Sequence, residues 1–359
     1  MGLSVGISVV CIIVGIIVAI TCKTRQSQRR KQMMDWWRIT SDELQPLNKS
    51  VTKSGFSNNS GSSTLHSTVH GSKATTVRSE GGFNVCLYKG GYVQRKFLSK
   101  GHIQVTFQIL REFEEIRDLM HPNLLRVIGA DLVSDKPFIV TEHCPKGTLQ
   151  ELLLSDNHFE LDLLFQSSLI LDIVNALTYL HKRFIYHGRL TSEVCMIDTR
   201  FSVKLDLYCL PTLYDTIKLK TEEESKEKDR LWVAPEHLRT GCKTGSMQGD
   251  IYSLAIIISE VISREEPYSN DKDYLTTREV LYKVQFPENP PFRPALTCPT
   301  ELISLERLMK QCWEEDPKKR PALNDIYSTL FKMAQEKGGK HGSLVDTLLN
   351  RLEKYRYDT

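Results

Sequence analysis

The chain has 359 residues, of which 40% are hydrophobic and 25% are charged, so most of it can bury a proper core in one large domain or two smaller ones. Its net charge of +3 is close to neutral for this length, which argues against a nucleic-acid partner. The nine cysteines form no Cys-x-x-Cys pair and no Cys/His cluster at zinc spacing, which argues against a zinc site and fits free thiols in a reducing cytosol.

The first predicted element is a membrane-spanning helix at residues 3–22. This segment carries no charge, and about twenty residues that rise ~1.5 Å each cross a hydrocarbon layer of ~30 Å. Basic residues follow at once and none precedes the segment, so the positive-inside bias leaves residues 1–2 outside and the rest of the chain in the cytoplasm. A cleaved signal peptide is the alternative, but the basic start and the small-residue cleavage site that it needs are missing. We expect a single-pass protein at the plasma membrane.

Residues 23–80 form a predicted juxtamembrane segment. It begins with basic residues, and from Asn48 to Glu80 it consists mainly of Ser, Thr, Gly and Asn with few large apolar side chains. Such a composition cannot offset the entropy of ordering, so we expect a flexible linker, whose end can hold the first strand of the next domain. The many hydroxyl groups leave open a second interpretation, in which the linker is phosphorylated.

The pattern becomes globular after residue 80. Alternation with period two over Phe83–Tyr88 and Tyr92–Leu98 predicts a hairpin, and helical spacing over Val105–Leu119 predicts a helix. A small strand-rich lobe followed by a larger helical lobe is an α+β arrangement with a cleft between the lobes. Further strands are expected at Leu125–Val133 and Pro137–Glu142, and further helices at Leu161–Lys182, Asp250–Ser263, Glu301–Trp313 and Leu323–Glu336.

Ordered landmarks between Phe83 and Lys337 resemble those of protein kinases. Lys96, on the second strand of the hairpin, stands where kinases have the lysine that grips ATP phosphates, and Glu112, on the following helix, stands where they have its glutamate partner. The resemblance implies a two-lobed protein-kinase-like fold over residues 81–337. The other landmarks are the hinge-like Thr141-Glu142-His143, His187-Gly188-Arg189-Leu190 in place of His-Arg-Asp-Leu, Ala234-Pro235-Glu236, Asp250-Ile251-Tyr252-Ser253, Cys312-Trp313, Asp316-Pro317, and Arg320-Pro321, whose arginine would pair with Glu236.

The positions that phosphoryl transfer needs carry the wrong side chains. The reaction needs a carboxylate that orients the attacking hydroxyl and ligands that hold Mg²⁺. Arg189 stands at the catalytic aspartate position, and a guanidinium has no acceptor. Val194 stands at the metal-binding asparagine position, and Leu207 replaces the aspartate of Asp-Phe-Gly, so neither can ligate a hard cation. Asp206 precedes that motif by one residue, and in a continued strand its side chain would point to the opposite face. We therefore expect no catalytic residue and no metal site.

The nucleotide cleft leaves two interpretations open. In the first, the cleft binds ATP without Mg²⁺; in the second, Lys96–Glu112 is a structural ion pair that holds the helix in place. Gln94 points to the same side of its strand as Lys96 and replaces the small alanine that usually covers adenine, where a buried amide costs free energy unless it finds partners. The residues expected to line an ATP cleft are Lys96, Glu112, Thr141, Glu142 and His143.

A hydrophobic spine of the kind that joins the two lobes in kinases is predicted by position. His187 is better interpreted as a packed core residue of this spine than as a base. An intact spine beside a site without catalytic groups indicates that conformation, rather than chemistry, is the output of the domain. The predicted members are Ile116, Ile128, His187 and Tyr208.

Several strings narrow the resemblance to receptor guanylyl cyclases. The sequence after the predicted span, Asp35-Trp36-Trp37-Arg38-Ile39, resembles their juxtamembrane start. Residues 338–359 resemble the helical linker that precedes their cyclase domain, and the apolar residues step by three and four, a short seam suited to dimerisation. A helix that lies on its own domain is the alternative. The other similar strings are His187-Gly188, Leu231-Trp232-Val233-Ala234-Pro235-Glu236, Asn289-Pro290-Pro291-Phe292-Arg293-Pro294 and Gln311-Cys312-Trp313-Glu314-Glu315-Asp316-Pro317.

The resemblance implies a membrane-anchored, catalytically inactive domain that relays a signal to a cyclase making cyclic GMP. That cyclase would lie in the same full-length chain or in a partner, because the sequence stops at Thr359 without a cyclase domain. The chain is then either a fragment of a receptor cyclase or a free-standing relative, and a homodimer through the last helix is expected. The rival functions are an unconventional ATP-dependent kinase that uses Asp206 for metal and a nucleotide-independent scaffold that binds partners through the Ser/Thr-rich linker.

Overall fold

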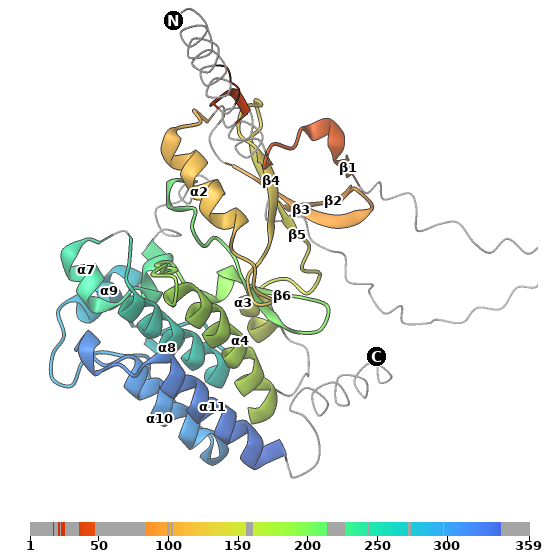
Figure 1. Ribbon diagram of the computed structural model, residues 1–359. Coiled ribbons are helices and arrows are strands. Elements are labelled where there is room, and N and C mark those ends of the chain that lie inside the picture. Colours follow the sequence, from red (N-terminus) through yellow and green to blue (C-terminus); the bar gives the residue numbers. More distant parts are fainter. Residues whose placement is uncertain are drawn as a thin grey trace, which may run out of the picture.

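The computed structural model describes residues 17, 21, 23–25, 36–46, 83–98, 101, 103–155, 161–213, 227–242, 244–271, 274–296 and 298–338. They form a strand-rich lobe and a larger helical lobe, which lies below the sheet in Figure 1. This is the predicted α+β, kinase-like arrangement. Most of the predicted membrane span at 3–22, all of the Ser/Thr-rich stretch at 48–80, and all but the first residue of the C-terminal helix predicted at 338–359 lie outside the described residues.

The strand-rich lobe is built on a five-stranded antiparallel sheet with the order β1-β2-β3-β5-β4. Helix α2 (Phe107–Arg117) lies against the sheet, and Thr106 begins it by accepting a hydrogen bond from the backbone N–H of Ile109. Ile109, Phe113 and Ile116 recur at the spacing of one helix face and are buried, which fixes this face of α2 to the core. The strands are β1 (Gln45–Pro46), β2 (Phe83–Tyr88), β3 (Gly91–Phe97), β4 (Val127–Asp131) and β5 (Phe138–Glu142).

The sheet begins earlier in the chain than predicted. Strand β1 (Gln45–Pro46) pairs with β2, Gln45 opposite Leu87, so residues before the Ser/Thr-rich segment already belong to this lobe. We call residues 36–46 the strap; its last two residues form β1. The expected boundary at residue 81 is therefore too late, because the linker connects two adjacent strands instead of preceding the domain. Alternating hydrophobicity could not reveal a strand of two exposed residues.

The helical lobe is organised around α4 (Leu163–His181) and α8 (Met247–Ser263), whose side chains are buried on nearly all sides. α4 is the only described helix that is long and apolar enough to cross a membrane, and 67% of its apolar window is buried, as in a core helix. The remaining helices are α3 (Leu149–Leu154), α7 (Pro235–Thr240), α9 (Thr277–Gln285), α10 (Ile303–Cys312) and α11 (Leu323–Gly338). Short 3₁₀ helices are Ser41–Glu43, Ser192–Val194, Asp229–Trp232, Ser269–Asp271, Thr300–Leu302 and Pro317–Lys319.

Local sequence explains where these helices begin and end. Thr148 and Thr276 each form a capping box with a glutamate three residues later, and Asp162 and Ser246 accept a backbone N–H bond at the starts of α4 and α8. Gly241 adopts the left-handed conformation after α7, which glycine enters without strain. A second, two-stranded sheet of β6 (Cys195–Ile197) and β7 (Val203–Leu205) lies at the junction of the lobes, where Leu124 bridges to Leu205.

Most predicted elements are confirmed within two or three residues. The hairpin, the α2 helix, both following strands and the four long helices of the second lobe all form. The short elements α3, α7 and α9 and the β6–β7 pair were not predicted. Segments of nine residues or fewer show too little periodicity to be distinguished from loops.

Glu260, in α8, is a fully buried carboxyl group within this core. Its oxygens contact Ser192 Oγ at 2.6 Å and accept a hydrogen bond from Trp232 Nε1 at 2.8 Å. Burial raises its pKa to about 8, although both hydrogen bonds act in the opposite direction. Because the folded protein holds a proton that the unfolded chain releases, the contribution of Glu260 to stability is fully present below the ordinary pKa and is lost as the pH rises through about 8.

We expect Glu260→Gln to remove this pH dependence, because an amide can keep both contacts and does not titrate. The free energy of unfolding of the variant relative to the parent protein should rise by up to about 1.4 kcal/mol per pH unit between the two pKa values and level off above the upper one. Chemical unfolding at about pH 5, 6.5, 8 and 9 measures the difference. Parallel pH profiles of the two proteins would contradict the assignment.

Candidate functional site

Lys96 and Asp206 meet in a buried ion pair between the two lobes. Lys96, on β3, is 3% exposed, and its Nζ contacts Oδ2 of Asp206, which is 6% exposed and follows β7. Two opposite charges in a site of low dielectric attract strongly, and removing one partner leaves the other charge buried and uncompensated. The pair therefore connects the sheet of one lobe to the junction strand of the other.

This pairing corrects the expected Lys96–Glu112 ion pair. Glu112, on α2, instead accepts hydrogen bonds from the backbone N–H and the hydroxyl of Thr212, and the N–H lies 3.3 Å from each carboxylate oxygen. Burial raises the pKa of Glu112, and the Thr212 hydrogen bonds partly offset this effect. The lysine and the glutamate of the kinase-like pair are thus both present, but each is held by a residue from the chain around Leu207.

The orientation of Asp206 was predicted wrongly. The prediction assumed that strand geometry continues through Asp206, but β7 ends at Leu205. The backbone N–H of Asp206 donates to Val194 O at 2.9 Å, and its carbonyl contacts His187 Nε2 at 2.8 Å. Leu207 then enters the left-handed region with φ of 58°, which turns the chain away from the strand direction. The side chain of Asp206 is thereby aimed at Lys96.

The loop that carries Arg189 is held by Asp250, the buried first-turn carboxylate of α8. Its two oxygens accept the backbone N–H groups of His187 and Gly188, each at 2.8 Å, and Oδ2 also contacts His181 Nε2 at 2.8 Å. Gly188 has φ of 74°, and a Cβ there would lie 2.0 Å from Thr244 O, so only glycine fits. The frame of a catalytic loop is present, although its acid position carries Arg189.

His187 and Val194 are packing residues in the structure. Burial lowers the pKa of His187, and its two ring nitrogens lie near backbone groups: Nε2 at the Asp206 carbonyl and Nδ1 at 3.4 Å from the Arg189 N–H. Val194 is 4% exposed and belongs to the main hydrophobic cluster. Neither position offers an oxygen ligand to a cation.

The predicted spine needs one correction. Ile116 and Tyr208 are buried in the main hydrophobic cluster, and the Tyr208 hydroxyl donates to Leu125 O at 2.8 Å. Ile128 does not join them, because it packs, half-buried, in a separate cluster on the other face of the sheet. Its neighbour Val127 occupies the main cluster instead. Successive strand residues face opposite sides, so an error of one position changes the face.

The hinge-like segment leaves several buried polar atoms without a hydrogen-bond partner among the described residues. These are Gln94 Oε1, Thr141 Oγ1 and His143 Nδ1. Gln94 and Thr141 are directly opposite each other on β3 and β5. Glu142 differs, because it accepts from Arg126 N–H and pairs with Lys204 Nζ, each at 2.8 Å. Burial lowers the pKa of His143, which favours the neutral ring.

These unpaired atoms are compatible with the base of a nucleotide, but the nearby residues are not compatible with the metal ion that usually accompanies it. Unpaired buried acceptors and donors beside a hinge fit a planar base that forms hydrogen bonds, since such atoms cost free energy until they are satisfied. The metal half does not fit: Val194 and Leu207 supply hydrocarbons, and Asp206 is engaged by Lys96. The described residues hold no group of three or more His, Cys, Asp or Glu residues that could bind a metal ion.

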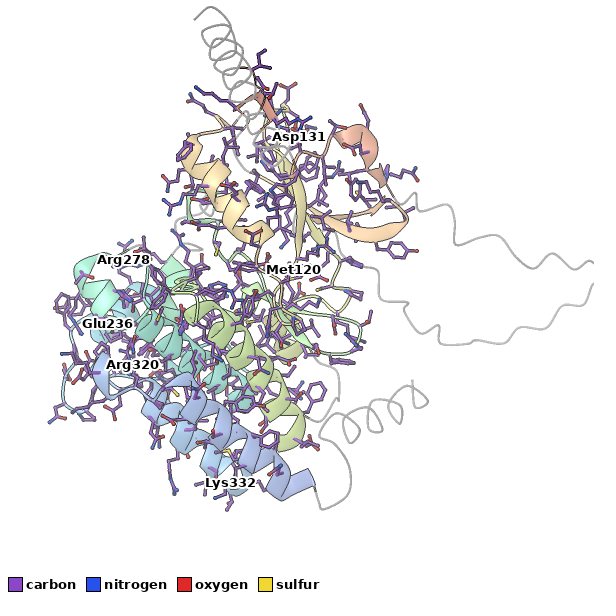
Figure 2. The ribbon with its side chains drawn as sticks, in the orientation of Figure 1. Met120, Asp131, Glu236, Arg278, Arg320 and Lys332 are labelled. Atoms are coloured by element: carbon purple, nitrogen blue, oxygen red, sulfur yellow. The ribbon has the colours of Figure 1, made fainter. Side chains whose placement is uncertain are left out.

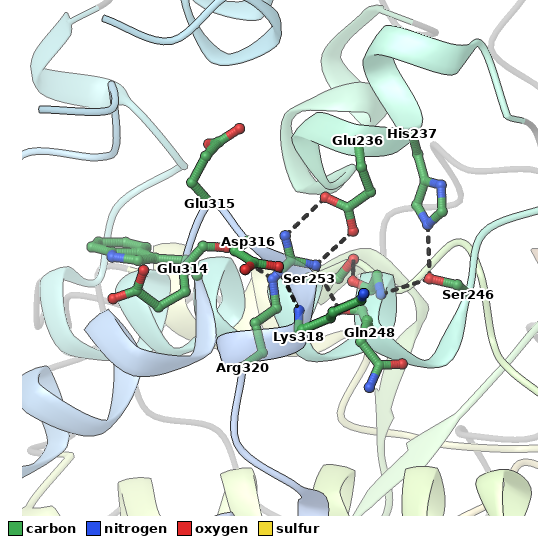
Figure 3. Close-up of polar contacts among 12 residues, drawn as sticks. Glu236, His237, Ser246, Gln248, Ser253, Glu314, Glu315, Asp316, Lys318 and Arg320 are labelled. Carbon is green, nitrogen blue, oxygen red and sulfur yellow. Dashed lines mark hydrogen bonds and ion pairs between the residues drawn. The ribbon is translucent and has the colours of Figure 1, made fainter. Parts of the chain in front are cut away.

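The pair of Glu236 and Arg320, predicted from the sequence, is present in the helical lobe (Figure 2). The guanidinium contacts both carboxylate oxygens, at 2.7 and 2.8 Å, and also donates to the carbonyls of Gln248 and Glu314, each at 2.9 Å. Figure 3 shows this fork, with Asp316 capping the adjacent 3₁₀ turn. The pair ties α7, α8 and the segment before α11 together.

Sequence reasoning missed Thr212 and the strap. No motif marks Thr212, whose importance comes only from the path of the chain after Leu207. The two tryptophans at the start of the strap were noticed only as part of a family resemblance, although a Trp pair beside polar residues is itself a signal for burial. Trp37 is 1% exposed and its ring stacks on Phe113 of α2 with centroids 4.8 Å apart.

Comparison with known proteins places this geometry in a family. A model of the family described as protein tyrosine and serine/threonine kinase matches residues 90–330. Retinal guanylyl cyclase 1 of Bos taurus is 36% identical over 286 residues, which are 76% of this chain and 25% of that protein. Retinal guanylyl cyclase 2 of Homo sapiens is 35% identical over 281 residues, 76% of this chain and 24% of that protein. Atrial natriuretic peptide receptor 2 of Rattus norvegicus is 33% identical over 326 residues, 89% of this chain and 30% of that protein. The chain spans about a quarter of the length of the curated relatives it matches.

We expect Asp250→Asn to loosen the loop that carries Arg189. An amide has one acceptor oxygen, so its NH₂ group would face a backbone N–H that the carboxylate now satisfies. The free energy of unfolding should fall by about 1–3 kcal/mol, as measured by chemical unfolding. Asp118→Asn is a matched control, because that side chain is 74% exposed and its loss should change stability by less than about 0.5 kcal/mol. Equal stabilities of the two variants would contradict the anchoring role of Asp250.

Proposed function

Because the chain belongs to the protein kinase family, and within it to the kinase-like part of receptor guanylyl cyclases, we propose that it is a catalytically inactive regulatory domain. In this proposal the domain receives a signal on the membrane side and passes it to a cyclase that makes cyclic GMP. The cyclase lies in the same full-length protein or in a partner. The output is a change of conformation, and no phosphate is transferred.

One observation carries the proposal: the frame of the kinase fold is intact while the groups that would act on a phosphate are replaced. Asp250 holds the loop, and Glu236 and Arg320 hold the helical lobe. By resemblance, the reaction would need carboxylates or amides at Arg189, Val194 and Leu207. A cation and two hydrocarbons can neither accept the proton of a hydroxyl nor hold Mg²⁺.

We also propose that the protein is anchored by residues 3–22, with the kinase-like domain in the cytoplasm. The uncharged segment and the basic residues that follow it support this topology. A homodimer through the helix predicted at 338–359 would bring two such domains together, as the spacing of its apolar residues suggests.

The regulatory proposal predicts a measurable effect on a related cyclase. We expect co-expression of the full chain with atrial natriuretic peptide receptor 2 to change the cyclic GMP made by stimulated cells by at least about twofold, because mixed assemblies would contain one altered kinase-like domain. The variant Arg320→Ala, which leaves Glu236 unpaired, should abolish the change at equal expression. An unchanged cyclic GMP response, with both chains present at the membrane, would count against a role in this pathway.

Metal-free ATP binding is a further part of the proposal. The unpaired hinge atoms would hold the base, and Lys96 would hold the phosphates if it left Asp206. Asp206 opposes this binding in two ways, because it occupies the lysine and because its charge repels phosphate where no metal neutralises it. A bound nucleotide would supply charge that draws Lys96 away from Asp206.

A second candidate function is an unconventional kinase that uses Asp206 as its metal ligand. The observation in its favour is the buried position of this carboxylate next to Lys96, which the sequence alone did not suggest. The two candidates require opposite contributions from Asp206. In metal-free binding the carboxylate weakens ATP affinity, whereas in a kinase it is needed for Mg·ATP.

Asp206→Asn therefore separates the candidates. We expect the variant to bind ATP in EDTA more tightly than the parent protein, by about tenfold, because it frees Lys96 and removes a negative charge. Thermal shift and calorimetric titration, with and without Mg²⁺, measure this, and Lys96→Ala should bind no ATP. Radiolabelled phosphate transfer that requires Mg²⁺ and is lost in Asp206→Asn would establish the kinase instead. The absence of any shift in all three proteins would favour the nucleotide-independent scaffold.

A further inference from the structure

The strap, residues 36–46, crosses from one edge of the sheet to the other. At its start, Trp37 O accepts the N–H of Ala130 at 2.5 Å and Ile39 N–H donates to Ala130 O at 3.0 Å, which adds a short parallel bridge to the β4 edge. At its end, Gln45–Pro46 pairs with β2 at the opposite edge. The strap therefore closes both edges of this lobe with one continuous segment.

The two halves of the strap contact different parts of the lobe. Ile39 and Leu44 are buried with side chains of β2, β3 and β5 in the separate cluster that also contains Ile128, which we call the outer cluster. Trp37 instead lies in the main cluster and stacks on Phe113 of α2 at an interplanar angle of 21°, while Trp36 meets the same ring edge-on at 6.4 Å. Only the tryptophan half of the strap can thus act on α2.

Gly129 is the position on β4 that admits the tryptophan half. A Cβ at this residue would lie 2.4 Å from Trp37 O and 2.6 Å from Ile39 Cδ1, so any larger residue must push the strap away. The register of β4 against β5 is irregular between Val127 and Gly129, next to the point where the strap bridges to Ala130. The strap and β4 are therefore in close contact at Gly129, and a close-packed contact of this kind leaves no room for a larger side chain.

α2 connects the strap to the helical lobe. Phe113 carries the strap contact, and the preceding residue, Glu112, holds Thr212 in the segment after Leu207. The two residues are adjacent on one rigid helix, so they point in directions about 100° apart and bridge two different neighbours. A shift of the strap that moves Phe113 must also move the Glu112 carboxylate.

We propose that the strap is a lever through which the membrane-proximal chain sets the position of α2 and, through Glu112 and Thr212, the state of the segment around Asp206. This inference rests on the proposed regulatory function and names the device that would receive its signal. The strap is suited to this role because it leads directly from the residues that follow the predicted membrane span into the core. In this proposal a force on the chain before Trp36 reaches α2 through the contacts of Trp36 and Trp37 with Phe113.

Hydrogen exchange of the full-length chain in lipid nanodiscs tests the lever. Trp37→Ala should speed amide exchange by about tenfold or more both in α2 and in the residues around Thr212, and should leave α10 and α11 unchanged. Leu44→Ala is the matched control, because Leu44 lies in the outer cluster, and its effect should stay in the strap and in β2, β3 and β5, without reaching α2 or the residues around Thr212. Faster exchange confined to residues 36–46 and β4 in Trp37→Ala would overturn the proposal.

A backbone variant keeps the test decisive if Trp37→Ala unfolds the whole protein. Gly129→Ala displaces the strap without removing an aromatic ring, and Gly91→Ala is its control, since a Cβ at Gly91 meets only Tyr88 O at an ordinary 3.7 Å. Gly129→Ala should speed exchange in α2 and around Thr212, and Gly91→Ala should not. Unchanged exchange around Thr212 in Gly129→Ala would refute the lever.

The strength of the coupling follows from a double-mutant cycle between Gly129→Ala and Thr212→Val. The combined effect on the unfolding equilibrium constant should depart from the product of the single effects by more than about threefold, and an additive result would show that the sites are independent. Neither measurement involves a cyclase. The lever and the regulatory function can therefore fail separately.

Discussion

Lys96 and Asp206 are both buried, and each charge is tolerable there only because the other neutralises it. This constraint determines the rest of the site. While Asp206 holds the lysine, Glu112 must find other donors, and it finds them in Thr212 at the end of the same segment. The position of α2 relative to the helical lobe thus depends on the position of Asp206 in the chain, one residue before Leu207.

The same segment keeps its framework although Leu207 stands where the family resemblance places an aspartate. Its backbone is fixed at Asp206 by Val194 O and by His187, and the side chain of Tyr208 is fixed by Leu125 O. None of these bonds uses the side chain of residue 207, so a leucine there removes none of them. In Asp250, by contrast, both carboxylate oxygens accept backbone N–H groups of the loop, and Oδ2 also contacts His181 Nε2. The hydrogen bonds that hold this framework therefore do not involve the side chain at position 207.

The limits of sequence reasoning follow from this distinction. Periodic burial predicted α2, α4 and α8, because a helix face that must meet the core repeats along the chain. Landmark spacing also placed Lys96, Glu112, Glu236 and Arg320. It could not give the partner of Lys96, because the choice between Glu112 and Asp206 depends on a left-handed turn at Leu207, and few non-glycine residues adopt one. Ile128 was misassigned for a similar reason, since an irregular register in β4 changes which face a residue occupies.

The strap adds a structural constraint that the spacing of landmarks along the sequence could not predict. Because β1 precedes the Ser/Thr-rich segment and pairs with β2 after it, both ends of that segment are anchored in one sheet. The membrane-proximal chain is therefore built into the lobe, and it is not merely tethered to it. In an ordinary linker, movement at one end is lost in the freedom of the chain. Here Trp37 and Phe113 are rings packed in direct contact, and close-packed interiors yield little before a neighbour must move. Under the regulatory function proposed above, the domain responds to the membrane-proximal chain through this contact and needs no phosphate chemistry.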